Sequence, residues 1–211
     1  MDEKPKIILF DGQPGDGKST LCAYLLYRTA HLYSYGFILS TTLYNDPIWG
    51  ALPWLNKIEI IDDVAGPLKK ILEAQKSVIK REKKKIRLAL VLDDLIGKTK
   101  FGDKDSISLL ATSRHDCVHI FITSQYTRAI IPMLRGIATE VYMSKPSDEG
   151  MEKQFVAYFR FLSKHQRELL IYDLIKAGQY VFCHFNRLEG NVYRLVKVPE
   201  KWIAEKEVFC Q

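Results

Sequence analysis

The sequence lacks the features that would place it in a membrane or outside the cell. No apolar run approaches the roughly 18 residues that a membrane-spanning helix needs. The first residues, MDEKPKIILF, lack the long apolar segment of a secretory signal peptide. The 4 cysteines are scattered and form no C-x-x-C pair, a pattern that suits a reducing compartment. We therefore expect a soluble, cytosolic protein that is not secreted and has no membrane span.

The sequence also lacks internal repeats and the composition of a disordered chain. With 211 residues it is long enough for one α/β domain with a full core, and too short for two ordinary domains. The net charge of +6 mildly favours a polyanionic partner. Charge alone does not establish DNA binding, because nucleotide sites contribute basic residues themselves. We expect a single domain over 1–211, with a nucleotide-binding core at 1–145 and a helical and β extension at 146–211.

What the sequence does contain is a phosphate-binding motif near its start. The apolar run from Ile7 to Phe10 predicts a buried strand, and the octapeptide GQPGDGKS, residues 12–19, then fits G-x-x-x-x-G-K-[ST]. Its residues are Gly12, Gln13, Pro14, Gly15, Asp16, Gly17, Lys18 and Ser19.

The chemistry of phosphate binding requires this spacing. The glycines let backbone N–H groups curl round a phosphate chain, Lys18 reaches the β- and γ-phosphates, and the Ser19 hydroxyl faces Mg²⁺. A helix after the loop would point its positive N-terminal end at the same phosphates. The alternative is a glycine-rich turn that binds nothing, but the strand before it and the helix after it favour a nucleoside triphosphate. No guanine-reading Asn/Thr-Lys-x-Asp motif is present, so we expect ATP with Mg²⁺.

Strand-like and helix-like segments alternate along the rest of the chain. This alternation predicts an α/β fold of the P-loop NTPase (RecA/FtsK-like) type, with a mostly parallel central sheet, flanking helices and a β-rich C-terminal edge. In the segment 67–84 the polar Gln75 interrupts an otherwise apolar helix face. Strands are expected over 7–10, 37–42, 58–61, 88–92, 118–122, 140–143, 180–185 and 192–198. Helices are expected over 19–33, 67–84, 104–114 and, as one long region, 148–177.

An acidic residue at the end of another buried strand should complete the Mg²⁺ site. One candidate pair, Asp62-Asp63, follows a short strand, and the other, Asp93-Asp94, follows the longer and wholly apolar run LALVL. We favour the second pair, whose strand we expect beside the P-loop strand at the sheet centre. Asp93 would hold Mg²⁺, and Asp94 would act as general base on the attacking water. For Asp62-Asp63 we favour helix capping ahead of Pro67.

The next strand ends in Ser124-Gln125. A polar side chain at this point would sit between the Mg²⁺-binding strand and the P-loop, within reach of the γ-phosphate. It could report hydrolysis to the rest of the domain. Ordinary capping of the strand end is an equally good interpretation from position alone.

The stretches GQPGDGKS, LVLDD and TSRHDCVHIFITSQY together resemble the FtsK–HerA superfamily of DNA-pumping ATPases. More narrowly, they resemble the poxvirus-type genome-packaging ATPases of large DNA viruses, virophages and related membrane-containing viruses. The Ser-Arg-His followed by Ser-Gln is the most distinctive mark, and LSTTLYNDPIW is also similar. The resemblance covers roughly residues 6–145.

This resemblance implies roles for individual residues. Gly12, Gly15, Gly17, Lys18, Ser19 and Thr20 would hold the phosphates, and Asp93 and Asp94 would serve Mg²⁺ and water activation. Gln125 would be the sensor, and Arg114 would be an arginine finger acting on a neighbouring subunit's site, a role worth about 10³–10⁵ in rate. From sequence alone we favour a surface arginine at a helix end for Arg114, and it is the resemblance that makes it the finger. Arg128, as the second choice, and Arg135 are rival fingers.

The resemblance also implies a function and partners. The protein would be an ATPase in a homo-oligomeric ring, moving double-stranded DNA without sequence preference into a viral capsid, with a capsid or portal-vertex protein as a partner. It would act in the host cytoplasm or nucleus, or in the virion. A cellular DNA-pumping or conjugation-type ATPase, a P-loop kinase acting on a small acceptor, and a non-enzymatic nucleotide-gated scaffold remain alternatives.

The densest positive run, KREKKK at 80–85, has two interpretations. It could contact the phosphate backbone of DNA, since such contacts need charge and no base reading. The plainer interpretation is a solvated helix end, where cations are favoured by the helix dipole.

Overall fold

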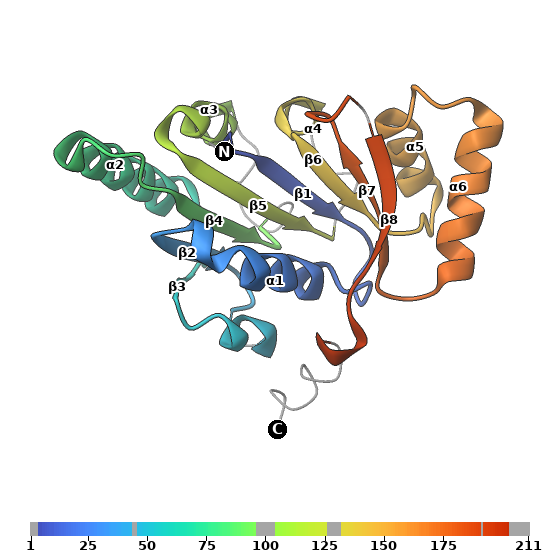
Figure 1. Ribbon diagram of the computed structural model, residues 1–211, viewed down its shortest axis with the longest axis horizontal. Helices are drawn as coiled ribbons and strands as arrows, with labels where there is room; N and C mark the ends of the chain where they lie inside the picture. Colours follow the sequence, from blue (N-terminus) through green and yellow to red (C-terminus); the bar gives the residue numbers. More distant parts are fainter. Residues whose placement is uncertain (1–3, 44–45, 96–103, 126–131, 191, 203–211) are drawn as a thin grey trace.

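The computed structural model describes residues 4–43, 46–95, 104–125, 132–190 and 192–202. They form one eight-stranded sheet with the order β3-β2-β4-β5-β1-β6-β7-β8 (Figure 1). The first six strands in this order pair in parallel, whereas β7 pairs antiparallel with both β6 and β8. Their bounds are β1 Ile7–Asp11, β2 Tyr35–Ser40, β3 Leu55–Glu59, β4 Leu88–Asp93, β5 Val118–Ser124, β6 Glu140–Met143, β7 Val181–Asn186 and β8 Val192–Lys197.

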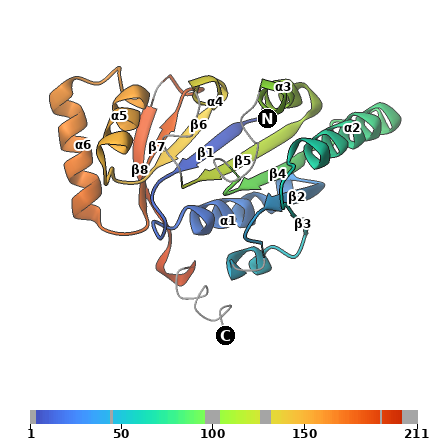
Figure 2. The same cartoon turned by 180° about the vertical axis from the view of Figure 1, so that it is seen from behind.

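Helices cover both faces of this sheet, as the two opposite views in Figures 1 and 2 show. One face packs against α1 (Lys18–Thr29) and the 3-10 helix η2 (Pro47–Ala51). The other face packs against α2 (Ala65–Glu82), α3 (Lys104–Ser113), α4 (Pro132–Ile137), α5 (Glu149–Tyr158) and α6 (Lys164–Ala177). Two further 3-10 helices, η1 (Ala30–Leu32) and η3 (Arg114–Asp116), continue α1 and α3.

The central strands are apolar along their whole length because both of their faces are covered. All five residues of β1 and all seven of β5 are buried. Alternate residues enter opposite cores: Ile7 and Leu9 pack under α2–α6, whereas Ile8 and Phe10 pack against the α1 side. This continuous apolar pattern is typical of parallel strands buried on both faces, and it carried the prediction of the α/β fold.

The prediction that the Asp93 strand lies beside the P-loop strand is wrong. Strand β5 lies between β4 and β1, pairing Ile7 with Ile120 on one side and Leu88 with Val118 on the other. Parallel strands are joined by crossovers, so their neighbours are not fixed by their order along the chain. The same arrangement agrees with the expectation that Gln125, at the end of β5, sits between the Mg²⁺-binding strand and the P-loop.

Other local predictions need correction. The expected helical region 148–177 is two helices, because Ser163 and Gln166 form a capping box that starts α6 anew. The third strand begins at Leu55, which is buried and pairs with Gly36, and Ile61 lies beyond its end, 82% exposed. Gln75 belongs to the buried face of α2, where its amide donates to the carbonyls of Ile86 and Asp116. The six-residue helix α4 was not predicted.

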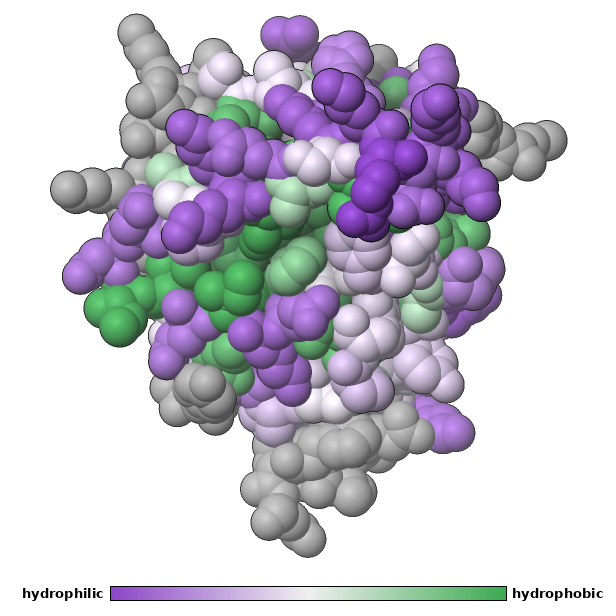
Figure 3. Space-filling model, turned by 90° about the vertical axis from the view of Figure 1, so that its left-hand side faces the viewer, coloured by the Kyte–Doolittle hydropathy of each residue, from purple (hydrophilic) through white to green (hydrophobic). Residues whose placement is uncertain are grey.

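The basic run 80–85 lies at the far end of α2, at the edge of the sheet where β4 begins. Figure 3 shows the molecule from the side on which α2 lies in Figure 1, and hydrophilic side chains dominate the upper part of this view. The cations Lys80, Arg81, Lys83, Lys84 and Lys85 are exposed. This exposure agrees with the plainer interpretation, a solvated helix end, and contact of the run with DNA stays a prediction.

In the described part of the chain no helix is both long enough and apolar enough to cross a membrane.

Candidate nucleotide-binding site

The phosphate loop connects the end of β1 to the start of α1 at the carboxyl edge of the sheet. Gly15 and Gly17 have φ of 85° and 88°, in the left-handed region that side chains other than glycine rarely adopt. A Cβ on Gly12 would collide with the hydroxyl of Ser144 at the end of β6. The glycines of the motif are thus required by backbone conformation and by close packing.

Asp16 closes the loop on itself. Its carboxylate accepts hydrogen bonds from the backbone N–H of Gln13 at 2.7 Å and from the Ser144 hydroxyl at 2.5 Å. Its own N–H donates to the Gln13 carbonyl at 3.2 Å. The variable position between the two final glycines therefore shapes the loop.

Lys18 lies at the mouth of this loop with its side chain almost fully buried. Its ammonium donates to the Gln13 carbonyl at 2.6 Å, and the loop backbone therefore curls around the charge. Burial lowers the pKa of Lys18, and the surrounding carboxylates of Asp16 and Asp94 act against that shift. The site thus places a cation where the phosphate chain of a nucleotide would lie.

Asp93, at the end of β4, is the most connected carboxylate of the site. One oxygen accepts from the Thr123 hydroxyl at 2.6 Å and the Ser19 hydroxyl at 3.3 Å. The other oxygen accepts from the Ser40 hydroxyl at 3.0 Å and the Trp49 indole N–H at 3.1 Å. Four separate segments of the chain therefore converge on one side chain, which is only 2% exposed.

Burial raises the pKa of the Asp93 carboxyl, although hydrogen bonds from Thr123 and Ser40 partly offset the shift. A hydroxyl and a carboxylate oxygen are the hard ligands that Mg²⁺ prefers, and this ion usually keeps waters and takes further oxygens from phosphates. In the described residues no group of three or more His, Cys, Asp or Glu side chains forms a metal site. The Ser19–Asp93 pair therefore fits a Mg²⁺ that is shared with a bound nucleotide.

Asp94 and Gln125 form a second pair beside Asp93. The Gln125 amide donates to the Asp94 carboxylate at 2.9 Å, which fixes the orientation of that carboxylate. Asp94 has φ of 53°, and its N–H donates to the Thr123 hydroxyl and carbonyl at 3.0 and 3.3 Å. A residue held in the left-handed region stores strain of about 1–3 kcal/mol, and such residues cluster at functional sites. The structure thus brings Asp93, Asp94 and Gln125 together at the carboxyl ends of adjacent strands.

Three further residues from the sequence analysis, Thr20, Asp63 and Pro14, also have defined places. Thr20 is fully buried in the first turn of α1, so it would reach a phosphate through its backbone N–H. Asp63 caps α2, accepting from the N–H groups of Ala65 and Gly66 at 2.9 and 3.1 Å, and this confirms the capping interpretation. Pro14 lies in the phosphate loop.

The three candidate arginines are placed unequally. Arg114 begins η3 after α3, and its side chain lies outside the described part of the chain. Arg128 also lies outside the described residues. Arg135, on α4, donates to the Gln154 side chain at 2.9 Å, and Gln154 in turn donates to the buried Asp11 at 3.4 Å. The Arg135 side chain is therefore bound within its own chain and linked through Gln154 to Asp11, the last residue of β1.

Sequence reasoning missed several contributors to the site. Ser40 and Trp49 hold Asp93 from β2 and η2. Both lie in the stretch LSTTLYNDPIW, which carries part of the resemblance, but no role was predicted for either residue. The side chain of Gln13 donates to the Asp148 carboxylate and the Met151 sulfur, both at 3.1 Å, which ties the phosphate loop to the start of α5. The available signal was a polar residue at a strand end, as with Ser40 and Ser144.

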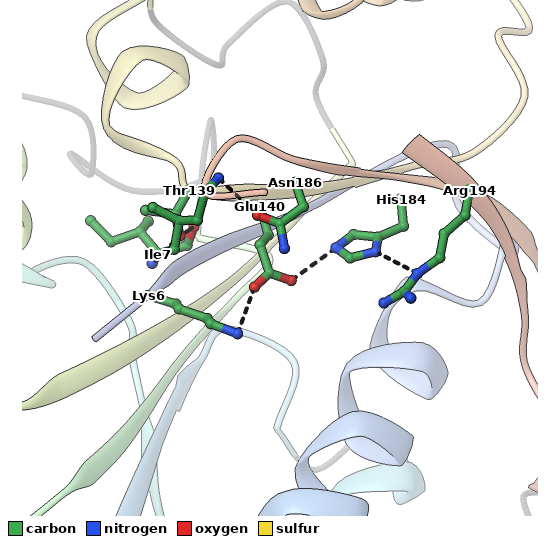
Figure 4. A network of polar contacts seen from close by, with 8 residues as sticks. Lys6, Ile7, Thr139, Glu140, His184, Asn186 and Arg194 are labelled. Atoms are coloured by element: carbon green, nitrogen blue, oxygen red, sulfur yellow. Dashed lines mark hydrogen bonds and ion pairs between the residues drawn. The ribbon is translucent and has the colours of Figure 1, made fainter. Parts of the chain in front are cut away.

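Another buried carboxylate, Glu140, is the first residue of β6 and therefore lies at the amino edge of the parallel strands. Figure 4 shows the polar network around it. The carboxylate accepts from Lys6 at 2.9 Å and from the Nε2 atom of His184 at 2.8 Å. Arg194 donates from Nε to His184 Nδ1 at 3.2 Å. Because a guanidinium only donates, Nδ1 must accept, and the His184 proton is therefore on Nε2. This network binds β1, β6, β7 and β8 together.

Comparison with solved structures agrees with this geometry. B204, described as the DNA-packaging ATPase from Sulfolobus turreted icosahedral virus, matches with a TM-score of 0.69 at 16% identity. The genome-packaging NTPase B204 of Sulfolobus turreted icosahedral virus 2, in complex with ATPγS, matches with a TM-score of 0.64 at 16% identity. Each match covers 92% of this chain and 98% of the other. The fold is that of a P-loop NTPase.

The same P-loop fold extends to a conjugation protein. The pCW3 conjugation coupling protein TcpA, in a monomer form with ATPγS, has a TM-score of 0.59 at 11% identity, and the match covers 100% of this chain and 66% of TcpA. No family model and no curated protein sequence matches the chain. The predicted resemblance to FtsK–HerA packaging ATPases is thus confirmed at the level of the fold.

Proposed function

We propose that the protein is an ATP-hydrolysing motor that moves double-stranded DNA into a viral capsid. The observation that carries the proposal is the convergence of the phosphate loop, the Ser19–Asp93 pair and the Asp94–Gln125 pair at one point. They meet at the carboxyl ends of β1, β4 and β5, at a switch point where the crossover through α1 leaves one face of the sheet and the crossovers through α3 and α4 leave the other. Ligands of open α/β sheets bind in the crevice at such a switch point.

Each residue has a role in this proposal. Backbone N–H groups of the loop and the Lys18 ammonium bind the phosphates, and Lys18 exchanges the Gln13 carbonyl for phosphate oxygens. Ser19 and Asp93 would hold Mg²⁺, which neutralises charge on the phosphates when it is bound. Asp94 orients the attacking water and accepts its proton, and Gln125 keeps that carboxylate in place.

Arg114 is proposed as the finger that completes a neighbouring subunit's site. Such an arginine stabilises the charge that develops on the γ-phosphate. Arg114 begins η3, shortly before β5, and we prefer it to Arg135 because the Arg135 side chain is already bound by Gln154 of the same chain. The active form would then be a homo-oligomeric ring.

The DNA and capsid parts of the proposal rest on the likeness to B204, which is described as a DNA-packaging ATPase. We propose the host cytoplasm or nucleus, or the virion, as the place of action. The likeness to TcpA favours a second candidate, a conjugation-type DNA pump. Resistance of DNA to nuclease after incubation with empty capsids would separate packaging from conjugation-type transfer.

The test of the motor is steady-state ATP hydrolysis with and without long double-stranded DNA. We expect stimulation by DNA, loss of activity in Lys18→Ala and Arg114→Ala, and partial recovery when the two variants are mixed, because each supplies what the other lacks. Lys176→Ala, at an exposed lysine of α6, is the matched control and should behave as wild type. Hydrolysis that ignores DNA but rises with a small phosphate acceptor would replace the motor with a kinase.

A further inference from the structure

Tyr180 packs against the phosphate loop although it lies 163 positions after Gly17 in the sequence. It immediately precedes β7 and has φ of 59°, and its carbonyl accepts from the Val198 N–H at 3.0 Å. A tyrosine in the left-handed region is strained, and such strain persists where surrounding contacts hold it. The backbone at Tyr180 is therefore fixed at a conformation that turns its side chain toward the loop.

The ring of Tyr180 lies directly on Gly17. A Cβ on Gly17 would overlap the ring at Cδ1 and come within 2.7 Å of Cε1. Gly17 is the N-cap of α1, the point from which the helix faces the phosphates. The ring is half-buried, so part of it is covered by the loop and the α1-side core and the rest is accessible.

The sheet order decides which end of a nucleotide Tyr180 would meet. Asp93 and Gln125 end β4 and β5, on one side of β1, and they mark the γ-phosphate and Mg²⁺ end of the site. Tyr180 leads into β7, on the other side of β1 beyond β6. A triphosphate laid across the loop therefore directs its ribose and base toward the side of Tyr180.

From this placement we propose that the Tyr180 ring is the platform on which the nucleobase stacks. The inference rests on the proposed ATP site and adds the residue that binds the nucleoside half. Stacking uses the π-face that every base has, and the stabilisation corresponds to roughly 10-fold in affinity or more per base. Binding should therefore depend on ring area, and purine triphosphates should lose more than pyrimidine triphosphates when the ring is removed.

The experiment compares Tyr180→Leu with Tyr180→Phe in the full chain. Both variants keep a large side chain on the same strained backbone, and only phenylalanine keeps the aromatic face. Titration calorimetry measures the affinity for Mg·ATP, Mg·UTP and Mg·tripolyphosphate, the last of which has no base. We expect Tyr180→Leu to bind ATP about 10-fold more weakly, UTP with a smaller loss, and tripolyphosphate within about twofold of wild type. Tyr180→Phe should match wild type for all three.

Each outcome separates this inference from the proposed function. An equal loss of ATP and tripolyphosphate affinity in Tyr180→Leu would mean that the ring only supports the loop, and an unchanged ATP affinity would mean that the base lies elsewhere. Either result overturns the inference while ATP binding by the wild type, and its loss in Lys18→Ala, still supports the nucleotide site. A wild type that binds neither Mg·ATP nor Mg·tripolyphosphate would overturn both this inference and the proposed function.

Discussion

A buried carboxylate lies at the carboxyl ends of the parallel strands and another at their amino ends. The contrast between their surroundings separates a functional site from a structural one. Asp93 at the carboxyl edge and Glu140 at the amino edge are 2% and 5% exposed. Asp93 is surrounded by neutral donors, namely hydroxyls and an indole. Glu140 accepts from the Lys6 ammonium and from His184. Glu140 thus contacts a cation directly, whereas the direct partners of Asp93 among the described residues are all neutral and the Lys18 ammonium acts on it only through space.

The pKa shifts of the two groups follow from this difference. Burial raises the pKa of Asp93, and its neutral partners do not reverse the shift. Burial acts in the same direction on Glu140, but hydrogen bonds from His184 and Lys6 outweigh it, and the pKa of Glu140 is lowered. A buried carboxylate with no cation in direct contact suits an external cation such as Mg²⁺. Glu140 already forms an ion pair with Lys6, so we assign it a structural role.

The largest expected effect comes from Asp93→Asn. We expect Mg²⁺-dependent hydrolysis to fall by about 10²–10³-fold, because the carboxylate that would hold the metal is lost. The stability of the nucleotide-free protein should change little by comparison, since removing a desolvated charge offsets the cost to the buried donors that lose an acceptor. Hydrolysis assays and the rise of Tm on adding Mg·ATP measure the two effects. A variant that keeps its Mg·ATP-induced rise would place the metal elsewhere.

The converse substitution, Glu140→Gln, should affect stability and not hydrolysis. Leaving Lys6 and His184 without their carboxylate should cost about 2–3 kcal/mol, less than a fully buried pair because Lys6 is partly exposed. For a chain of this size that corresponds to a fall in Tm of about 4–12 °C. Calorimetry and hydrolysis per folded molecule are the measurements. A loss of hydrolysis with unchanged Tm would contradict the structural assignment.

The contribution of Glu140 should depend on pH with a definite sign. Because its pKa is lower in the folded state than in the unfolded chain, the stabilisation is fully present above the unfolded value of about 4.3 and disappears as the pH falls through the folded value. The difference in urea midpoint between wild type and Glu140→Gln should therefore be constant near neutrality and shrink below about pH 4. A difference that grows on acidification would refute this sign.

The smallest effect is expected at Asp63, the third carboxylate in this comparison after Asp93 and Glu140. Its carboxylate caps α2, so Asp63→Ala should lower the free energy of unfolding by about 1 kcal/mol. Hydrolysis should remain at the wild-type rate, and Asp63→Asn should restore much of the stability, because asparagine is also a good cap. Reduced Mg²⁺ dependence of hydrolysis in Asp63→Ala would reopen the assignment of the metal site to Asp93.

The sequence predicted those parts of the fold that are written in local patterns. Continuous apolar runs marked β1, β4 and β5, and the glycine spacing marked the phosphate loop, because backbone conformation itself demands these residues. The cap at Asp63 followed from its position before Pro67. The side chains at the strand ends, Asp93 and Gln125, were predictable because parallel strands finish at a common edge.

The rest depends on contacts between distant segments, which no local pattern encodes. The insertion of β5 between β4 and β1 is a matter of sheet order. Trp49 reaches Asp93 across 44 positions, and Gln13 reaches Asp148 across 135. Gln75 looked like a break in the apolar face of α2, because its buried partners are carbonyls that lie 11 and 41 positions away.

The central place of β1 has a consequence for how the protein is made. Its two neighbours are β5 and β6, which leave the ribosome more than 100 residues later. Until then β1 is an apolar strand with two unpaired edges, a segment prone to association with other chains. Long-range pairing of this kind also slows folding. The phosphate loop therefore takes its shape only after residue 144 has been made, when Ser144 can reach Asp16.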